Sequence, residues 1–255
     1  MSTAQHIPRK RFGQHFLVSP GVIGRIVDAL APRADDRMVE IGPGLGALTV
    51  PLLDHLDHLQ VVELDRDLVS HWQAHALAER LTVHAADALA FDFARIGERF
   101  KVAGNLPYNI STPLLFHLAD YAQHIERMVL MLQKEVVDRM VAEPGTPAYG
   151  RLSVGLQVRF GMYRLCSVPP GAFNPPPKVD SAVVVLQPLG DSAPAIADPV
   201  RFEAVVTAAF GQRRKTLRNA LSSLLDETRI RAAGVEPGAR AEQLSPADFI
   251  RLAHV

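Results

Sequence analysis

The chain has little cysteine, no long apolar run and no net charge, and each shortage excludes a class of protein. Its one cysteine, Cys166, cannot form an internal disulfide, which fits a reducing compartment. No stretch approaches the ~20 consecutive apolar residues of a membrane-spanning helix, and Met1–Lys10 has no apolar signal-peptide core. We therefore expect a cytoplasmic protein. With 27 basic and 27 acidic residues, it would need local basic patches to bind a polyanion.

The sequence also has little that indicates a metal or a reactive thiol. His55 and His58, and His71 and His75, have spacings that suit a metal on a helix face, but neither pair has a convincing third ligand. Cys166 lies in a pattern typical of a strand, which does not favour a catalytic nucleophile. We expect no metal site.

Hydrophobic β runs alternate with helical patterns over the first 190 residues, which predicts an α/β fold with a parallel, doubly wound sheet. The β runs are Met38–Ile41, Leu59–Leu64, Leu81–Ala85, Phe100–Ala103 and Arg127–Gln133. The helical patterns cover Pro20–Leu30 and residues near 47–56, 66–79, 112–120 and 134–142. Two later runs, Tyr163–Val168 and Ser181–Leu186, are joined by a proline-rich loop without a helix. We expect them to form an antiparallel pair at the sheet edge.

The composition changes near residues 190–199, which read as a linker. Beyond it the pattern is purely helical, with segments at Val200–Phe210, Lys215–Leu225, Glu227–Ala233 and Pro246–Ala253. Ser245 is placed to be the N-cap of the last helix. The sequence thus predicts a first domain over residues 1–190 and a small all-helical domain over residues 191–255.

A glycine-rich turn follows the first long β run, in Glu40-Ile41-Gly42-Pro43-Gly44-Leu45-Gly46. Glycines permit positive φ and a close approach of the backbone to a ligand, which then meets free N–H groups at a helix start. The turn alone is also compatible with an ordinary βα connection. Because Gly42-x-Gly44-x-x-Ala47 fits a loose dinucleotide fingerprint too, it does not choose a cofactor.

Two acids follow the next two strands. Glu63 ends its strand beside the glycine turn, where a carboxylate accepts hydrogen bonds from ribose hydroxyls. Asp87 follows the third strand and could accept a hydrogen bond from an adenine amine, although a helix N-cap explains it as well. Taken together, the three successive strand ends favour an adenosine-type cofactor.

The tetrapeptide Asn105-Leu106-Pro107-Tyr108 follows the fourth strand and suits methyl transfer to an aromatic amine. Such an amine is a poor nucleophile because its lone pair is delocalised into the ring. Asn105 Oδ1 and a carbonyl of Leu106 or Pro107 could accept its N–H groups and turn the lone pair toward a methyl group. Pro107 makes the loop rigid, and Tyr108 offers a face on which an unpaired base can stack. Catalysis would then consist mainly of positioning.

Several motifs in the same order together resemble the ribosomal RNA adenine N6-dimethyltransferase family, from about Arg9 to near the C-terminus. The matching segments are Arg9–Leu17, Glu40–Gly46, Glu63–Asp65, Asp87–Ala88, Asn105–Tyr108, Val168–Ser181 and Phe210–Leu217. The strongest likeness is to the bacterial small-subunit branch of this family.

The resemblance implies a Rossmann-like S-adenosylmethionine-dependent methyltransferase sheet with a small C-terminal all-helical domain. The implied reaction is dimethylation of two adjacent adenines in the loop of the hairpin near the 3′ end of 16S rRNA, late in small-subunit assembly. The donor site would be lined by His15, Leu17, Gly42, Gly44, Glu63, Asp87 and Asn105. Asn105, Leu106, Pro107 and Tyr108 would hold the target amine, with Phe173 stacked on the other face of the base. Family members often have Asn where this chain has His15, which can still donate a hydrogen bond.

Two basic clusters are candidates for RNA contact. Arg213, Arg214, Lys215 and Arg218 lie at the start of a predicted helix, where the helix dipole disfavours cations, so phosphate binding explains them better than solvation. Arg9, Lys10 and Arg11 precede the Phe12-Gly13-Gln14 segment and form the second cluster. The expected partner is 16S rRNA in the immature small subunit, and nothing in the sequence demands more than a monomer.

Three other functions stay open at this point. A large-subunit rRNA adenine methylase of the macrolide-resistance type shares the core motifs, but Phe210–Leu217 and the Pro176–Ser181 segment favour the small-subunit enzyme. A non-catalytic ribosome assembly factor would not need intact catalytic motifs. A nucleotide-dependent dehydrogenase would explain the glycine turn and Glu63 but not Asn105–Tyr108.

Overall fold

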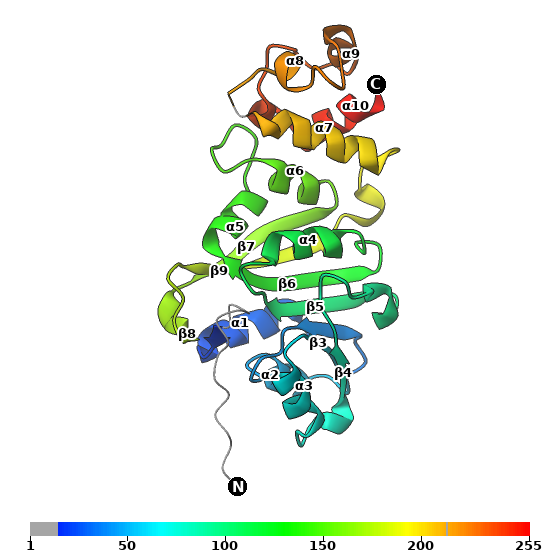
Figure 1. The fold of residues 1–255 in the computed structure, drawn as a ribbon. Helices are drawn as coiled ribbons and strands as arrows, with labels where there is room; N and C mark the ends of the chain where they lie inside the picture. The colour runs from blue at the N-terminus through cyan, green and yellow to red at the C-terminus, as the bar shows by residue number, and fades with distance from the viewer. Residues whose placement is uncertain (1–14, 213) are drawn as a thin grey trace. The chain divides into compact units, whose positions relative to one another are not determined.

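The structure is a computed structural model that describes residues 15–212 and 214–255 (Figure 1). The chain divides into two compact units. The sheet unit contains the chain up to Val137 and Tyr163–Gln187, and the helical unit contains Asp138–Met162 and Pro188–Val255. In the described part of the chain, no helix has the length and apolar character needed to cross a membrane.

The sheet unit is built on a seven-stranded sheet in the order β4–β3–β2–β5–β6–β9–β7 among the described residues (Figure 1). Its strands are β2 (Met38–Ile41), β3 (Leu59–Glu63), β4 (Leu81–Ala85), β5 (Phe100–Asn105), β6 (Ile125–Gln133), β7 (Phe160–Val168) and β9 (Ser181–Pro188). The β4–β3–β2–β5–β6 pairings are all parallel, and β9 pairs antiparallel with β6. The predicted α/β class is confirmed. The late β runs do lie at the sheet edge, with β9 between β6 and β7.

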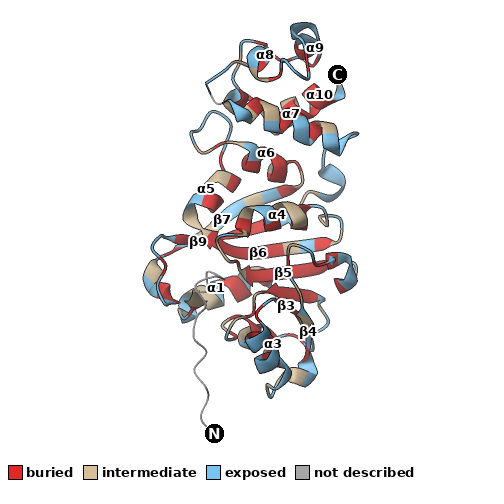
Figure 2. Ribbon diagram, viewed as in Figure 1, coloured by how far each residue is buried: buried red, intermediate tan, exposed pale blue. Residues whose placement is uncertain are grey.

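Burial on both faces explains why the central strands read as nearly continuous apolar runs. Every residue of β2 is buried, and so are the first five of β5, which Figure 2 shows in red beside the red strand β6. The helices and 3-10 turns of this part of the chain are α1 (Pro20–Leu30), α2 (Thr49–Leu53), α3 (Arg66–Gln73), η2 (Ala78–Arg80), η3 (Phe93–Ile96), α4 (Ser111–Ala119), α5 (Lys134–Met140) and η4 (Pro170–Ala172).

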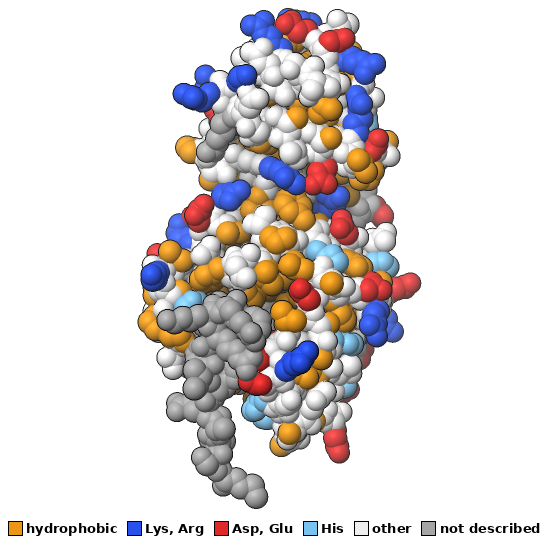
Figure 3. All heavy atoms as spheres, viewed as in Figure 1, with side chains coloured by type: hydrophobic (Ala, Val, Ile, Leu, Met, Phe, Trp, Pro, Cys, Tyr) orange, Lys and Arg blue, Asp and Glu red, His pale blue; other side chains and the backbone are white. Residues whose placement is uncertain are grey.

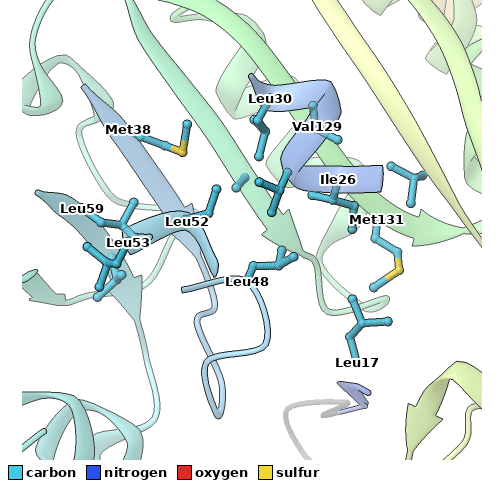
Figure 4. Close-up of a cluster of buried hydrophobic side chains, with 14 of the residues drawn as sticks. Leu17, Ile26, Leu30, Met38, Leu48, Leu52, Leu53, Leu59, Val129 and Met131 are labelled. Carbon is cyan, nitrogen blue, oxygen red and sulfur yellow. The ribbon is translucent and has the colours of Figure 1, made fainter. Parts of the chain in front are cut away.

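Helix α1 packs against the sheet in one hydrophobic core. Ile26 and Leu30 of α1 lie against the side of the sheet that carries Val129 and Met131 of β6 (Figure 4). Helix α1 begins with Pro20 in its first turn and ends at Ala31 in a left-handed conformation, so its predicted bounds are confirmed.

A separate two-stranded sheet joins two distant segments of the sheet unit. Strand β1 (Phe16–Leu17) pairs antiparallel with β8 (Phe173–Asn174), so that Leu17 lies opposite Phe173. The sequence analysis did not predict either strand. The pairing attaches the N-terminal segment to the proline-rich loop.

The helical unit has its own core. Its elements are α6 (Arg151–Gln157), η5 (Gly190–Ser192), α7 (Pro199–Gly211), α8 (Leu217–Ala220), α9 (Glu227–Ala232), η6 (Ala241–Gln243) and α10 (Pro246–His254). Ser245 accepts a hydrogen bond from Asp248 N–H, which confirms the predicted N-cap of α10. The helix predicted over Lys215–Leu225 is only four residues long in the structure and continues as turns.

The division of the chain differs from the expected single boundary at residue 190. Residues 138–162 group with the C-terminal helices, because Tyr149, Val154 and Val158 are buried in the same cluster as Phe202 of α7 and Phe249 of α10. The change in composition indicated the boundary near residue 188. Nothing in the composition indicated that residues 138–162 also belong to the helical unit.

Candidate active site

A cavity opens at the carboxyl ends of β2, β3, β4 and β5. Its volume of about 160 Å³ holds a ligand rather than one or two waters. The residues around it come from four successive strand ends and from the start of β1 with the residue before it. They include His15, Phe16, Gly42, Gly44, Glu63, Leu64, Asp87, Asn105, Leu106, Pro107, Tyr108 and Asn109. A second cavity adjoins the glycine turn and is lined by Leu17, Glu40, Leu45 and Asn105 among others.

Two glycines of the turn are required by their surroundings. Gly44 has φ +53, and a Cβ atom there would lie 3.0 Å from the Phe16 ring. Gly46 has φ +95, and a Cβ atom there would lie 2.8 Å from the Trp72 ring. Any other residue would be strained at both positions. Because neither glycine has a side chain, the backbone of the turn borders the cavities directly.

Glu63 is buried at the end of β3 and is held by backbone donors. Its Oε1 accepts hydrogen bonds of 2.8 Å from the N–H groups of Leu64 and Asp65. Burial raises the pKa of Glu63, and these bonds, with a further one from Gly44 N–H, oppose that rise. The carboxylate is thus fixed, and its Oε2 receives neither the Leu64 nor the Asp65 bond.

Asp87 lies in the same cavity at the end of β4 and is exposed. Its Oδ1 accepts a hydrogen bond of 2.9 Å from Leu89 N–H. The local capping that the sequence allowed is therefore present. It uses one carboxylate oxygen, so Asp87 can hold a ligand amine with the other.

Asn105 ends β5, and its amide orientation is set by the N-terminal segment. Its Nδ2 donates a hydrogen bond of 2.8 Å to the His15 carbonyl, so Oδ1 is the acceptor that remains. The Pro107 carbonyl already accepts bonds from Ile110 N–H and Ser111 Oγ. Leu106 N–H donates to Met131 O at 3.0 Å. These contacts favour the Leu106 carbonyl as the backbone acceptor beside Asn105.

Tyr108 is fixed at its hydroxyl and on its face. The hydroxyl lies 2.6 Å from Ser181 Oγ, and burial raises its pKa, so the phenol keeps its proton at neutral pH. The His15 ring stacks on Tyr108 with centroids 5.8 Å apart and an interplanar angle of 26°. His15 Nδ1 in turn lies 2.8 Å from the Pro175 carbonyl. A rigid aromatic pair therefore stands next to the Asn105 amide.

Comparison with known proteins assigns this arrangement to a family. The family model described as ribosomal RNA adenine dimethylase matches residues 5–255, nearly the whole chain. The chain belongs to the ribosomal RNA adenine dimethylase family. It is therefore a methyltransferase that acts on ribosomal RNA, as the resemblance implied.

Curated relatives and solved structures agree with this membership. The ribosomal RNA small subunit methyltransferase A of Aromatoleum aromaticum is 56% identical over 98% of this chain and 94% of its own length. The protein of the same name from Thiobacillus denitrificans is 57% identical over 96% of each chain. The fold is similar to that of a dimethyladenosine transferase from Plasmodium falciparum, with a TM-score of 0.79, 28% identity and 93% and 96% of the two chains covered. The 23S rRNA methyltransferase ErmE gives a TM-score of 0.72 at 27% identity, over 94% and 98% of the two chains.

One residue expected in the site of this dimethylase lies elsewhere than expected. The Phe173 ring is 4% exposed and packs in the hydrophobic core of the sheet unit, and it does not line either cavity. Pairing of β8 with β1 turns it inward beside Leu17, so the structure does not place it against a target base. Leu17 lines the second cavity, together with Gly42, Gly44 and Asn105 of the expected donor site.

Sequence reasoning missed Glu40. It is buried in β2, and Thr49 Oγ1 donates a hydrogen bond of 2.6 Å to its Oε2. Burial raises the pKa of Glu40 to about 8, with a smaller contribution from the charge of Glu63. The available signal was an acid within an apolar strand directly before the glycine turn.

The remaining predicted residues are surface cations and histidines. Arg214, Lys215 and Arg218 are exposed, and Arg218 lies 3.5 Å from Glu227. Arg9, Lys10, Arg11 and Arg213 lie outside the described residues. His71 and His75 flank the Trp72 ring, and within residues 15–212 and 214–255 no three His, Cys, Asp or Glu side chains form a group suited to a metal ion.

Proposed function

We propose that this dimethylase transfers methyl groups from S-adenosylmethionine to N6 of two adjacent adenines in the 3′-terminal hairpin loop of 16S rRNA, during small-subunit assembly. The observation that carries the proposal is that one cavity contains both an adenosine-type site, around Glu63 and Asp87, and the Asn105–Tyr108 loop. Relatives named for the small subunit are 56–57% identical over 94–96% of their length, which favours that subunit as the source of the substrate.

The residues around the cavity fit the proposed donor. Ribose hydroxyls and the adenine amine are hydrogen-bond donors, and Glu63 and Asp87 present carboxylate acceptors at two neighbouring strand ends. The glycine turn lets the backbone approach the ligand, because a Cβ atom at Gly44 would press on the Phe16 ring. When bound, S-adenosylmethionine supplies a methyl group on a sulfonium, which is already a good leaving group.

The protein's own contribution at the target is to position a weak nucleophile. Asn105 Oδ1 and the Leu106 carbonyl accept the two N–H groups of the exocyclic amine, which aims its lone pair at the methyl group. The Asn105 amide cannot turn over without losing its bond to the His15 carbonyl. Tyr108 supports the base, which must be unpaired to reach the cavity. The proton that the alkylated amine releases passes to solvent.

The basic residues of the helical unit are proposed to contact RNA phosphates. Arg214 and Lys215 are exposed and precede the short helix α8, which also carries Arg218. Arg213, Arg9, Lys10 and Arg11 belong to the same proposal by their sequence motifs alone. On the face shown in Figure 3, basic and acidic side chains are interspersed, in keeping with a net charge of zero and with local rather than global attraction to RNA. We propose that the active form is a monomer.

Label transfer tests the function directly. The protein is incubated with methyl-labelled S-adenosylmethionine and small subunits that lack the modification, and the labelled bases are mapped. We expect dimethyladenosine at the two adjacent positions of 16S rRNA. Absence of label, with a known methylase active under the same conditions, would refute the proposal.

A second candidate substrate is 23S rRNA, because the fold is similar to ErmE with a TM-score of 0.72. The same labelling with 23S rRNA separates the two. Label on 23S rRNA alone would replace the small-subunit assignment, while the methyltransferase chemistry of the site would stand.

A further inference from the structure

The only tryptophan of the chain lies directly beneath the glycine turn. Trp72 is fully buried in helix α3, together with Leu68 and Val69. Its indole Nε1–H donates a hydrogen bond of 3.0 Å to the Gly44 carbonyl. Its ring also occupies the space next to Gly46, where a Cβ atom would come within 2.8 Å of it. One side chain thus contacts two of the three glycines of the turn.

Both the N–H and the carbonyl of Gly44 form contacts with side chains. Its N–H lies near the Glu63 carboxylate and helps to keep it ionised, while its carbonyl is bound by the indole. Both holding groups come from one short segment, since Glu63 ends β3 and Trp72 lies in the helix that follows. At φ +53, Gly44 has the freedom of a glycine, so the direction of the next peptide plane depends on these contacts.

The direction of that plane decides where a backbone donor points. In a planar trans peptide the C=O and the N–H point in opposite directions. Because the Gly44 carbonyl points at the buried indole, the Leu45 N–H points away from it. Leu45 lines the second cavity, which shares Gly42, Gly44 and Asn105 with the first. The N–H groups of Gly42 and Gly46 are bonded to Val62 O and Pro43 O. Among the described residues, no acceptor binds the Leu45 N–H, so it remains for a ligand.

We infer that Trp72 is a positioning residue for the methyl-donor site, which fixes the Gly44 carbonyl and thereby aims the Leu45 N–H at the bound donor. The inference rests on the proposed function, since it takes the glycine turn to be the donor site. It concerns an indole N–H that touches neither the donor nor the RNA.

Replacing Trp72 by Phe keeps an aromatic ring and removes the N–H. We expect the Kd of S-adenosylhomocysteine and the KM for the donor to rise about five- to tenfold, as for loss of one hydrogen bond of ordinary strength. The kcat at saturating donor and the KM for the subunit should change by less than about twofold. Calorimetry gives the Kd without any need for RNA or turnover.

The matched control is Phe93→Leu, another fully buried aromatic of the sheet unit, which packs against Phe91 and Tyr121 instead of the turn. If Trp72→Phe lowers the melting temperature as the control does but leaves the Kd unchanged, the role of Trp72 is structural and the inference is wrong. If the wild-type protein itself does not bind S-adenosylhomocysteine, the donor assignment fails first.

A measurement on the wild-type protein covers the case in which Trp72→Phe does not fold. A single tryptophan gives one indole cross-peak in a ¹H–¹⁵N spectrum. Addition of S-adenosylhomocysteine should shift that cross-peak, because the ligand binds on the other side of the peptide that the indole holds. An unshifted cross-peak at a concentration that calorimetry shows to be saturating would overturn the inference.

Discussion

Asn105 donates from its amide nitrogen to the His15 carbonyl, and this one bond leaves the amide oxygen as the free acceptor of the side chain. An asparagine amide has two ends of nearly the same shape, and only its oxygen can accept the N–H of an amine. The orientation that the proposed methyl transfer needs is therefore present before any substrate arrives. The proposed reaction would depend on such prior alignment because the nucleophile is weak.

Replacing Asn105 by Ala should lower kcat by about 10²–10³-fold, the usual loss when one preorganised hydrogen-bonding group is removed. Binding to the immature subunit should change little, because the side chain is small and lies inside the cavity. Single-turnover labelling and a subunit pelleting assay measure the two effects, with exposed Asn219→Ala as the control. Equal loss of binding and methylation would contradict separate catalytic and binding roles.

Glu40 makes stability depend on pH in the direction opposite to most surface carboxylates. Its folded-state pKa is raised from 4.5 to about 8 by burial. Below pH 4.5 both the folded and the unfolded chain hold this proton. As the pH rises toward 8, the unfolded chain releases it and the folded chain does not, so unfolding becomes easier by at most ~1.4 kcal/mol for each pH unit.

Replacing Glu40 by Gln should therefore flatten the pH dependence of stability between pH 5 and pH 8. Urea denaturation at the two pH values gives the free energy of unfolding for wild type and variant. Exposed Glu79→Gln is the control and should follow the wild type. A wild-type stability that does not decline over this range more than that of Glu40→Gln would show that Glu40 ionises freely.

At the scale of elements, the glycine turn and strand β1 fit together. Gly44→Ala adds a methyl group 3.0 Å from the Phe16 ring at a φ of +53, so the turn or β1 must move. We expect S-adenosylhomocysteine to bind about tenfold more weakly or worse, by calorimetry.

The control for this substitution lies in helix α1. A Cβ atom at Gly24 meets nothing within 4 Å, so Gly24→Ala should leave binding unchanged and stabilise the helix by about 0.5–1 kcal/mol. If Gly44→Ala bound S-adenosylhomocysteine as tightly as the wild type, strand β1 would be able to move without changing the binding site, and the prediction would be wrong.

Local sequence patterns predicted the helices and strands whose bounds are set by their own residues. Strand Met38–Ile41 and helix Pro20–Leu30 agree with their predicted bounds, because a mostly apolar run marks the strand and a proline in the first turn marks the helix. Strands β1 and β8 are two residues long and exist only through their pairing across the chain. No local pattern indicates such a pairing, and for the same reason the sequence did not show that Phe173 would be buried beside Leu17.

The site residues divide in the same way. The glycine turn, Glu63, Asp87 and Asn105–Tyr108 all meet in one cavity, as parallel strand ends predict. Their supporting contacts come from remote positions, such as Ser181 on Tyr108 and the Pro175 carbonyl on His15. Residue types and motifs in the sequence indicate which side chains line the candidate site. Only the folded structure shows which remote residues hold those side chains in place.

At the scale of the whole molecule, RNA affinity is expected to depend on salt through a few cations of the helical unit. Replacing both Arg214 and Lys215 by Gln should weaken binding to the subunit and reduce the slope of log affinity against log salt by about two. S-adenosylhomocysteine binding should stay as in the wild type, because that cavity belongs to the sheet unit.

Arg231→Gln is the comparison for that variant. Arg231 is in the same unit and lies 3.2 Å from Glu236, so it is already neutralised within the protein. We expect a wild-type slope for it in the same filter-binding titration. An unaltered slope in the Arg214, Lys215 variant would remove these two cations from the RNA interface.

The β1–β8 pairing has a consequence for the time at which activity begins during synthesis. Residues 15–17 leave the ribosome early, yet their partners at 173–175 and the serine that holds Tyr108 follow more than 150 residues later. A nascent chain released before residue 181 can form most of the parallel sheet but lacks the contacts that hold His15 and Tyr108. We therefore expect newly made chains to be inactive until nearly three-quarters of the polypeptide has emerged.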